Sequence, residues 1–272
     1  MASPTEIKPQ QLARLIGTPE CPVLIDVRID ADFEDDPRMI PGARRHAFDQ
    51  AATLAESLTG TRALVYCQKG LKLSQGVAAV LRASGIPAET LEGGHFGWRE
   101  AGLPMVDAAK LPRRNAQGQT VWVTRHRPKI DRIACPWLIR RFVDPTAQFL
   151  FVEPSQVLSV ADRFDATPFD IEDVFWSHHG EVCTFDTMIH EFGLRSPPID
   201  RLATIVRGAD TNRHDLAPEA AGLLAASLGL SRMYRDDLEQ LTAGLALYDM
   251  FYRWARDATD EGHDWPTSAT KA

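Results

Sequence analysis

The sequence has few cysteines and no long run of apolar residues. Its 272 residues include four cysteines, Cys21, Cys67, Cys135 and Cys183, which are too widely spaced for a disulfide framework or a Cys-x-x-Cys metal site. No stretch approaches the roughly 20 apolar residues that span a bilayer, and the first residues lack the apolar core of a signal peptide. We therefore expect a soluble protein of the reducing cytoplasm, without a membrane partner.

Positive charges are fewer than negative charges, which argues against nucleic acid as a partner. The chain carries 30 Lys and Arg against 37 Asp and Glu, a formal net charge of −7 at pH 7. The distribution is uneven, because residues 110–141 hold nine Lys or Arg and a single Asp. Such a basic island indicates an anion site or an interaction surface, or else a solvated face of a strand and a helix.

What is present in quantity is apolar sequence in short runs. Hydrophobic residues make up 44% of the chain and charged residues 25%, which is typical of a globular protein with a core. The runs "PVLIDVR" (22–28) and "RALVYC" (62–67) are of strand length, and "SQGVAAVLRASG" (74–85) is helical, with Gly85 expected to end the helix. This alternation predicts an α/β layer with a mostly parallel sheet flanked by helices.

A polar stretch without a periodic apolar face divides the chain. We place a linker at residues 109–119, between a first domain (1–108) and a second domain (120–272). In the second domain "VWVTR" and "AQFLFVEP" are predicted strands, with a helix starting near residues 131–133 between them, and residues from about 197 to 260 are almost wholly helical. The second domain is therefore predicted to be an α/β unit that carries a mainly helical bundle.

The segment "VYCQKGLKLSQG" sets Cys67 between the end of a predicted strand and the start of a helix. A strand–loop–helix corner points successive backbone N–H groups at one spot, and Gly70 allows the backbone to close around it. These donors, together with Lys69 and Lys72, predict a lowered pKa for the Cys67 thiol. The alternative is a buried, inert cysteine at the end of a strand. The candidate loop comprises Gln68, Lys69, Gly70, Leu71 and Lys72.

Four separated segments resemble the landmarks of the rhodanese domain, in order and over about residues 5–108. They are "LIDVR" (24–28), "MIPGARR" (39–45), "YCQKGLKLS" (66–74) and "LEGGHFGWREAGLPM" (91–105). The resemblance implies that Cys67 is catalytic and that residues 67–72 form a sulfur-binding loop, one residue shorter than the loop of phosphatases with the same fold. It implies a sulfurtransferase that takes sulfur from a donor such as thiosulfate, forms a persulfide on Cys67 and passes the sulfur to a thiol or cyanide. No cofactor is required for this chemistry.

Cations and a second thiol gather at the start of the second domain. Arg125 and Arg127 share a face if their segment stays extended. Arg132 and Cys135 fall near the positive end of the predicted helix. The group predicts an anion site beside a second reactive cysteine. The alternative is a core cysteine packed beside Trp137, with the arginines on a solvated surface.

Residues 175–193, "FWSHHGEVCTFDTMIHEFG", concentrate the side chains that bind metals. A helix from about residue 181 would place Cys183, Asp186 and His190 on one face, which suggests a zinc or iron site. The spacing matches no closed metal-binding motif, and Asp215 further on fits the N-cap of the next helix. The candidate ligands are His178, Cys183, Asp186, His190 and Asp210.

The second domain resembles the C-terminal domain of ChrB-type chromate-resistance proteins over about residues 120–258. The segments that carry the resemblance are "RPKIDRIACPWLIRRFVD" (127–144), "SHHGEVCTFD" (177–186), "VRGADT" (206–211) and "PEAAGLLAASLGLSR" (218–232). The resemblance implies a link to chromate response. Three hypotheses follow: a sulfurtransferase, a sensor in which Arg125, Arg127 and Arg132 bind chromate or sulfate, and a metal-dependent second domain served by the first. Regulators of this family carry a DNA-binding region where this chain has its rhodanese-like segment, so a regulatory role is not the first expectation.

Overall fold

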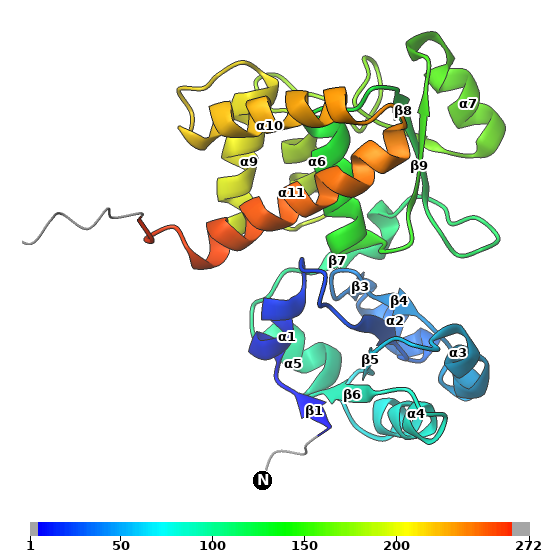
Figure 1. Cartoon of the computed structure of the whole chain (residues 1–272). Coiled ribbons are helices and arrows are strands. Elements are labelled where there is room, and N and C mark those ends of the chain that lie inside the picture. The colour runs from blue at the N-terminus through cyan, green and yellow to red at the C-terminus, as the bar shows by residue number, and fades with distance from the viewer. Residues whose placement is uncertain (1–4, 263–272) are drawn as a thin grey trace, which may run out of the picture.

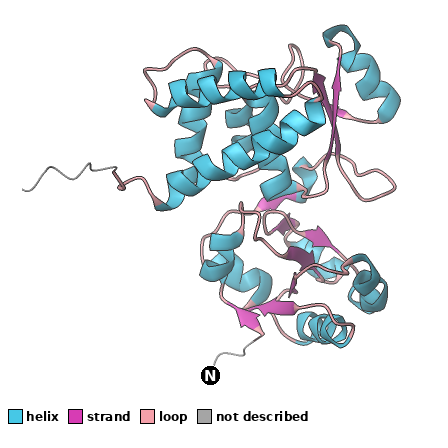
Figure 2. Cartoon of the chain, in the orientation of Figure 1, coloured by secondary structure: helices cyan, strands magenta, loops and turns pink. Residues whose placement is uncertain are grey.

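The structure is a computed structural model, and it describes residues 5–262. Figure 1 shows two halves, one coloured blue to cyan around a sheet and one coloured green to red and built mainly of helices. Figure 2 shows the same division by secondary structure, with the helices gathered in the second half. Within residues 5–262, no helix is both long and apolar enough to cross a membrane.

A five-stranded parallel sheet forms the centre of the first half, as predicted. Its strands, in spatial order, are β1 (Glu6–Ile7), β6 (Ala88–Leu91), β5 (Ala63–Tyr66), β2 (Val23–Asp26) and β4 (Arg44–Arg45). The two apolar runs of the sequence are β2 and β5, which lie side by side in the middle of the sheet. Every residue of β5 is buried, as expected for a central strand covered on both faces.

Helices cover both faces of this sheet, and side chains alternate between them along each strand. On one face Leu64 and Tyr66 of β5 belong to the large apolar core, whereas Val65 belongs to a separate cluster on the other face. The helices of this half are α1 (Pro9–Leu15), α2 (Asp30–Asp35), α3 (Ala51–Ser57), α4 (Lys72–Ala83) and α5 (Gly94–Glu100). A small antiparallel pair joins β3 (Arg38–Met39) to β7 (Val106–Asp107). Gly85, at φ +80°, follows the end of α4, as predicted.

The second half is an α/β unit with a helical bundle, which confirms the predicted class. Three parallel strands lie in the order β10 (Thr167–Pro168), β8 (Val121–Arg125) and β9 (Gln148–Val152). The helices are α6 (Asp131–Leu138), which continues through a π-helical turn (Ile139–Val143), α7 (Val157–Phe164), α8 (Thr184–Glu191), α9 (Pro197–Asp210), α10 (Glu219–Met233) and α11 (Asp237–Asp257). The expected N-cap at Asp215 is wrong: α10 begins at Glu219, and Asp215 instead forms an ion pair with Arg213.

The two halves share one apolar core. A continuous buried cluster runs from Leu12 and Ile16 in the first half to Phe142 and Tyr252 in the second. At Gly17 the fit is so close that an added Cβ would lie 2.4 Å from the Phe142 ring and 2.7 Å from the Tyr252 ring. The segment at the expected linker therefore joins two bodies that are packed against each other.

Candidate functional site

Cys67 lies at the carboxyl end of a central strand. It directly follows β5, and α4 begins five residues later at Lys72. The residue is only 5% exposed, so the loop surrounds the thiol on most sides. Gly70 has a φ of +70°, the conformation for which the sequence indicated glycine. The strand–loop–helix corner predicted from the sequence is therefore present.

Hydrogen-bond donors set the charge state of this thiol. Burial by itself raises the pKa of Cys67, but the Ser74 hydroxyl and the backbone N–H groups of Ser74, Leu71 and Lys69 oppose it, and the net result is a pKa below the ordinary value. Ser74 Oγ lies 3.3 Å from Cys67 Sγ. The side chains of Lys69 and Lys72 are exposed and are not among the main causes. The pKa of Cys67 is lowered, as expected. The main side-chain cause is the Ser74 hydroxyl, however, and not the charges of the two lysines.

A glycine turn closes the back of the loop. The N–H of His95 donates to the carbonyl of Cys67 at 2.9 Å, and the N–H of Phe96 donates to the carbonyl of Gln68 at 3.1 Å. A Cβ added to Gly94, whose φ is +58°, would lie 2.2 Å from the Cys67 carbonyl oxygen and 2.3 Å from the Gly70 nitrogen. Backbone thus packs directly on backbone, which explains why the segment "LEGGHFG" accompanies the loop.

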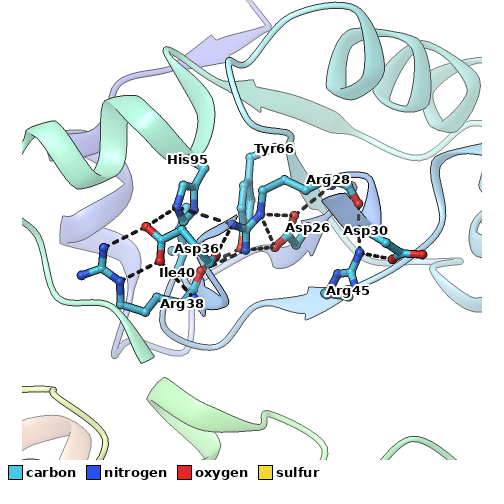
Figure 3. A network of polar contacts seen from close by, with 9 residues as sticks. All are labelled: Asp26, Arg28, Asp30, Asp36, Arg38, Ile40, Arg45, Tyr66 and His95. Atoms are coloured by element: carbon cyan, nitrogen blue, oxygen red, sulfur yellow. Dashed lines mark hydrogen bonds and ion pairs between the residues drawn. The ribbon is translucent and has the colours of Figure 1, made fainter. Parts of the chain in front are cut away.

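A buried ion pair supports the strand beside the loop. Asp26 and Arg28 both have fully buried side chains, and Arg28 Nη2 lies 2.7 Å from Asp26 Oδ2. The same guanidinium donates to the carbonyl oxygens of Asp36 at 2.7 Å and Arg38 at 2.9 Å. Figure 3 shows this guanidinium reaching both Asp26 and the 36–38 segment. The pair therefore fixes the end of β2 to the following chain.

His95 connects this network to α5. Its Nε2 lies 3.1 Å from Asp36 Oδ2 and 3.4 Å from Arg28 Nη1 (Figure 3). Burial, followed by the charge of Arg28, lowers the pKa of His95. Hydrogen bonds from Arg38 are the largest cause of a lowered pKa at Asp36. The helix that carries the glycine turn is thus held to the same polar frame as β2.

The three arginines predicted to form one anion site do not do so. Arg125 and Arg132 both contact Asp170, at 3.2 and 3.3 Å from its Oδ2. Arg127 has a φ of +55° and turns away, donating to the carbonyls of Tyr234 and Ser231 at the end of α10. The expectation was wrong because β8 ends at Arg125, so the extended geometry that would keep the side chains on one face is lost.

Cys135 does not have the predicted character of a reactive thiol. It is fully buried in α6 within the same apolar core as Trp137, as the alternative interpretation required. Burial, followed by the charges of Asp131 and Asp170, raises the pKa of Cys135 well above its ordinary value. The helix dipole that the prediction invoked is outweighed by burial and by these neighbouring carboxylates.

The predicted metal ligands separate into three places. His178 and Asp210 meet, with Nε2 3.3 Å from Oδ2. Cys183 and Asp186 form the cap of α8, with Sγ 3.2 Å from Oδ2, and His190 is exposed and paired with Glu191. The shared helix face therefore brings Cys183 to Asp186 but leaves His190 outside.

Two further carboxylates join His178 and Asp210. The His178 Nε2 atom is 3.4 Å from Asp170 Oδ1 and 3.6 Å from Asp131 Oδ2. We call these four residues the acidic cluster. Hydrogen bonds to Asp170 and Asp210 raise the pKa of His178 to about 10. Asp131 carries no local signal in the sequence beyond the start of a helix, and Asp170 carries none.

The basic island contributes instead to a pocket between the halves. This cavity of about 660 Å³ is lined by Asp144 and by residues near the amino ends of β2 and β5, away from the Cys67 loop. Arg44 Nε is buried there, and it has no hydrogen-bond partner in the part of the chain that the structure describes. Burial, followed by the charge of Arg114, lowers the pKa of Arg44. The arginines of the lining are Arg44, Arg45, Arg114, Arg140 and Arg141.

Comparisons with known proteins address the two halves separately. A rhodanese-like domain protein from Staphylococcus aureus is 26% identical, covering 35% of this chain and 90% of that chain, with a TM-score of 0.31. A rhodanese-related protein from Thermoplasma volcanium is 22% identical, covering 37% of this chain and 96% of that chain, with a TM-score of 0.33. Both align with about a third of the chain.

A curated relative aligns with a longer stretch. Protein ChrB from Cupriavidus metallidurans is 32% identical in an alignment of 178 residues, and the match covers 60% of this chain and 53% of that protein. The chain thus spans about half the length of this relative. Two family models match consecutive parts of the chain, "Rhodanese-like domain" at residues 8–101 and "ChrB, C-terminal domain" at residues 122–255. The chain therefore contains a rhodanese-like domain followed by a ChrB C-terminal domain.

Proposed function

We propose that this chromate-resistance-related protein is a rhodanese-type sulfurtransferase with Cys67 as its nucleophile. The observation that carries the proposal is the position of a buried thiol at the strand–loop–helix corner, where Ser74 Oγ lies 3.3 Å from Cys67 Sγ. This hydroxyl and three backbone N–H groups lower the pKa of the thiol. A thiolate is the nucleophilic form of cysteine, and the same donors suit a persulfide, which carries its negative charge one atom further out. The match to the rhodanese-like family supports this assignment.

The reaction takes place in two displacement steps, the first forming the Cys67 persulfide and the second removing its outer sulfur. The Cys67 thiolate attacks the outer sulfur of thiosulfate, a new S–S bond forms, and sulfite leaves with the electron pair of the broken bond. Cyanide then attacks the outer sulfur of the Cys67 persulfide, and thiocyanate leaves as the thiolate is restored. An acceptor thiolate reacts in the same way and becomes a persulfide anion. The loop N–H groups stabilise the anionic sulfur between the two steps, as an oxyanion hole stabilises oxygen.

The exposed residues of the loop are suited to bringing anions to the thiol. Lys69 and Lys72 are exposed on either side of Gly70, and their charges favour the approach of a dianionic donor. Leu71 is 56% exposed between them and offers an apolar contact to an acceptor. The buried hydrogen-bond donors therefore stabilise the bound sulfur, and the exposed lysines attract the arriving substrate.

Steady-state kinetics with thiosulfate and cyanide tests the proposal on the full chain. We expect thiocyanate formation by the wild-type protein and its loss in Cys67→Ala. Cys21→Ala is the matched control, because Cys21 is a free thiol that lines the pocket between the halves, and it should retain the wild-type rate. A wild-type protein that forms no thiocyanate, or a Cys67→Ala variant of wild-type activity, would contradict the proposal.

A second function, oxyanion binding, is favoured by the pocket between the halves. Arg44 places an unpartnered, buried Nε there, and the lining contains five arginines against one aspartate. We propose that sulfate or chromate binds in this pocket. Calorimetric titration with sulfate should show weaker binding in Arg44→Gln and unchanged binding in Arg125→Gln. The opposite ranking would return the anion site to the arginines indicated by the sequence.

A further inference from the structure

We propose that the acidic cluster, Asp131, Asp170, His178 and Asp210, is a binding site for a divalent first-row metal ion. The cluster lies in the ChrB C-terminal domain, apart from Cys67. The proposal goes beyond sulfur transfer and does not depend on it.

The four side chains come from four separate parts of the chain. Asp131 is the first residue of α6, Asp170 follows β10, His178 precedes α8, and Asp210 ends α9. Asp170 has a φ of +54°, and Ile130, just before Asp131, has a φ of +43°, a conformation that is rare for a β-branched residue. The fold thus holds left-handed backbone at Asp170 and at the residue that precedes Asp131.

The segments that make this domain recognisable meet at the cluster. Of the four segments quoted for the ChrB resemblance, residues 127–144 supply Asp131, residues 177–186 supply His178 and residues 206–211 supply Asp210. These segments are distant in sequence and share no helix or strand, so the acidic cluster is the place where they are brought together.

The distances are long for hydrogen bonds and match the spacing of ligand atoms around an ion. One nitrogen, His178 Nε2, lies 3.3, 3.4 and 3.6 Å from oxygens of Asp210, Asp170 and Asp131. Good N–H···O bonds are about 2.7–3.2 Å long, and one N–H points at a single acceptor. Ligand atoms about 2.1 Å from a shared metal ion are instead roughly 3.0–3.5 Å apart. Candidate ligand atoms of Asp131, Asp170 and His178 also lie within 4.8 Å of one another.

Asp131 supplies an independent sign that a ligand is accommodated here. Its side chain is 1% exposed, and its Oδ1 atom is buried without a hydrogen-bond partner among residues 5–262. Its other oxygen, Oδ2, is the atom that lies near His178 and accepts a hydrogen bond from the N–H of Phe185 at 3.3 Å. A buried carboxylate oxygen without a partner is costly, and a metal ion at the cluster offers the carboxylate a cationic partner.

The surroundings orient the candidate ligands. The Thr184 hydroxyl donates to Asp170 Oδ1 at 2.9 Å, while Arg125 and Arg132 contact Asp170 Oδ2. Partners of this kind fix the direction of a metal-binding carboxylate. The His178 side chain is 41% exposed, so the cluster is open to ions from solvent on that side.

The donor set indicates the class of metal. One imidazole nitrogen with up to three carboxylates suits Mn²⁺ or Fe²⁺. Cys183 stands beside this set, hydrogen-bonded to Asp186 Oδ2 at 3.2 Å and to the Asp131 side chain, but it is outside the group of ligand atoms that lie within 4.8 Å of one another. The proposed donors are therefore nitrogen and oxygen atoms, unlike those of a zinc–thiolate centre. Arg125 and Arg132, two of the three arginines that the sequence suggested for anion binding, then serve as outer partners of the metal ligand Asp170.

Titration of the full chain with Mn²⁺ tests the proposal. Protein treated with EDTA and desalted is titrated with Mn²⁺, and free Mn²⁺ is followed by electron paramagnetic resonance. We expect one Mn²⁺ per chain in the wild type and at least about tenfold weaker binding in His178→Ala and Asp210→Asn. His190→Ala is the matched control, because His190 is an exposed histidine outside the cluster, and it should bind as the wild type does.

A structural role alone would give a different pattern. If the cluster is only an internal ion network, the wild type binds no stoichiometric Mn²⁺, and that result overturns the proposal. Equal binding by His178→Ala and His190→Ala overturns it as well. Asp131 is avoided because its substitution threatens folding, and circular dichroism checks that the variants are folded. Mn²⁺ should raise the melting temperature of the wild type but not that of His178→Ala.

Discussion

The Cys67 loop and the acidic cluster are built from opposite materials. Around Cys67 the chain gathers a hydroxyl and backbone N–H groups, whereas around His178 it gathers three carboxylates. The first arrangement stabilises negative charge and the second stabilises positive charge. Burial disfavours a charged group in both places, so the sign of the surrounding partners decides which ion persists.

The same lesson is visible in two cysteines. Cys67 is 5% exposed and Cys135 is fully buried, so burial raises the pKa of both thiols. At Cys67 the donors reverse this effect, and at Cys135 the nearby carboxylates add to it. A cysteine near the start of a helix is therefore not reactive by position alone.

The largest expected loss of stability comes from breaking the buried Asp26–Arg28 ion pair beside the Cys67 loop. Asp26→Asn leaves the Arg28 guanidinium buried without its counter-charge, because both side chains have no exposed area. Breaking one partner of such a pair costs about 3–5 kcal/mol of unfolding free energy. Urea unfolding measures it. Asp30→Asn, at a carboxylate whose side chain is 86% exposed, is the control and should cost less than about 1 kcal/mol. Equal losses in the two variants would refute the role given to the pair.

A matched pair of glycine variants tests how closely the loop is built. Gly94 and Gly85 both have positive φ, so alanine at either pays a similar backbone penalty of about 1–2 kcal/mol. A Cβ on Gly94 also meets the Cys67 carbonyl, whereas a Cβ on Gly85 meets no described residue within 4 Å. Gly94→Ala should cost a further 1–3 kcal/mol or so and abolish sulfur transfer, while Gly85→Ala keeps its activity. Equal stability and activity of the two variants would show that the close contact is unimportant.

Ser74→Ala weakens the donor set around Cys67 without touching the thiol itself. The lowered pKa keeps Cys67 ionised at lower pH, so loss of the hydroxyl raises the pKa and reduces the thiolate fraction near neutrality. A hydrogen bond to a charged group contributes about 1.5–3 kcal/mol. The rate of iodoacetamide alkylation against pH should shift to higher pH in Ser74→Ala and stay unchanged in Ser84→Ala, at the residue that follows the same helix. An unshifted profile in Ser74→Ala would mean that the amides alone set the pKa.

The smallest expected effect is the absence of sulfur on the other buried thiols. After thiosulfate treatment, mass spectrometry of peptides should find added sulfur on Cys67. None is expected on Cys135 or Cys183, because both are fully buried and burial raises their pKa values. Added sulfur on either of these thiols would reveal an internal relay and remove the contrast between the two regions.

The sequence pattern was enough to predict the strand–loop–helix corner at Cys67, because this corner is built from consecutive residues. The corner at Cys67 depends on one strand, one loop and one helix that are consecutive in sequence, and Gly70 marks the left-handed position. Ser74 lies in the same segment, but its contact with Cys67 depends on how the first turn of α4 is placed. The pairing of Asp36 with His95 joins residues 59 positions apart and left no signal in the sequence.

The acidic cluster shows the limit of spacing arguments more strongly. A helical face correctly brought Cys183 to Asp186, but the partners of His178 come from α6, α9 and the segment after β10. The arginine prediction failed at one dihedral angle, since the positive φ of Arg127 ends the extended run. Such turns are set by tertiary packing, which a single sequence does not display.

The close packing of Gly17 against Phe142 and Tyr252 limits how the two halves can be separated or combined with other domains. If the chain were cut near residue 110, each fragment would expose the apolar surface that the other fragment covers in the intact protein. Fusing either half to an unrelated domain would require new side chains at this contact, so we expect the two halves to be exchanged or engineered only together.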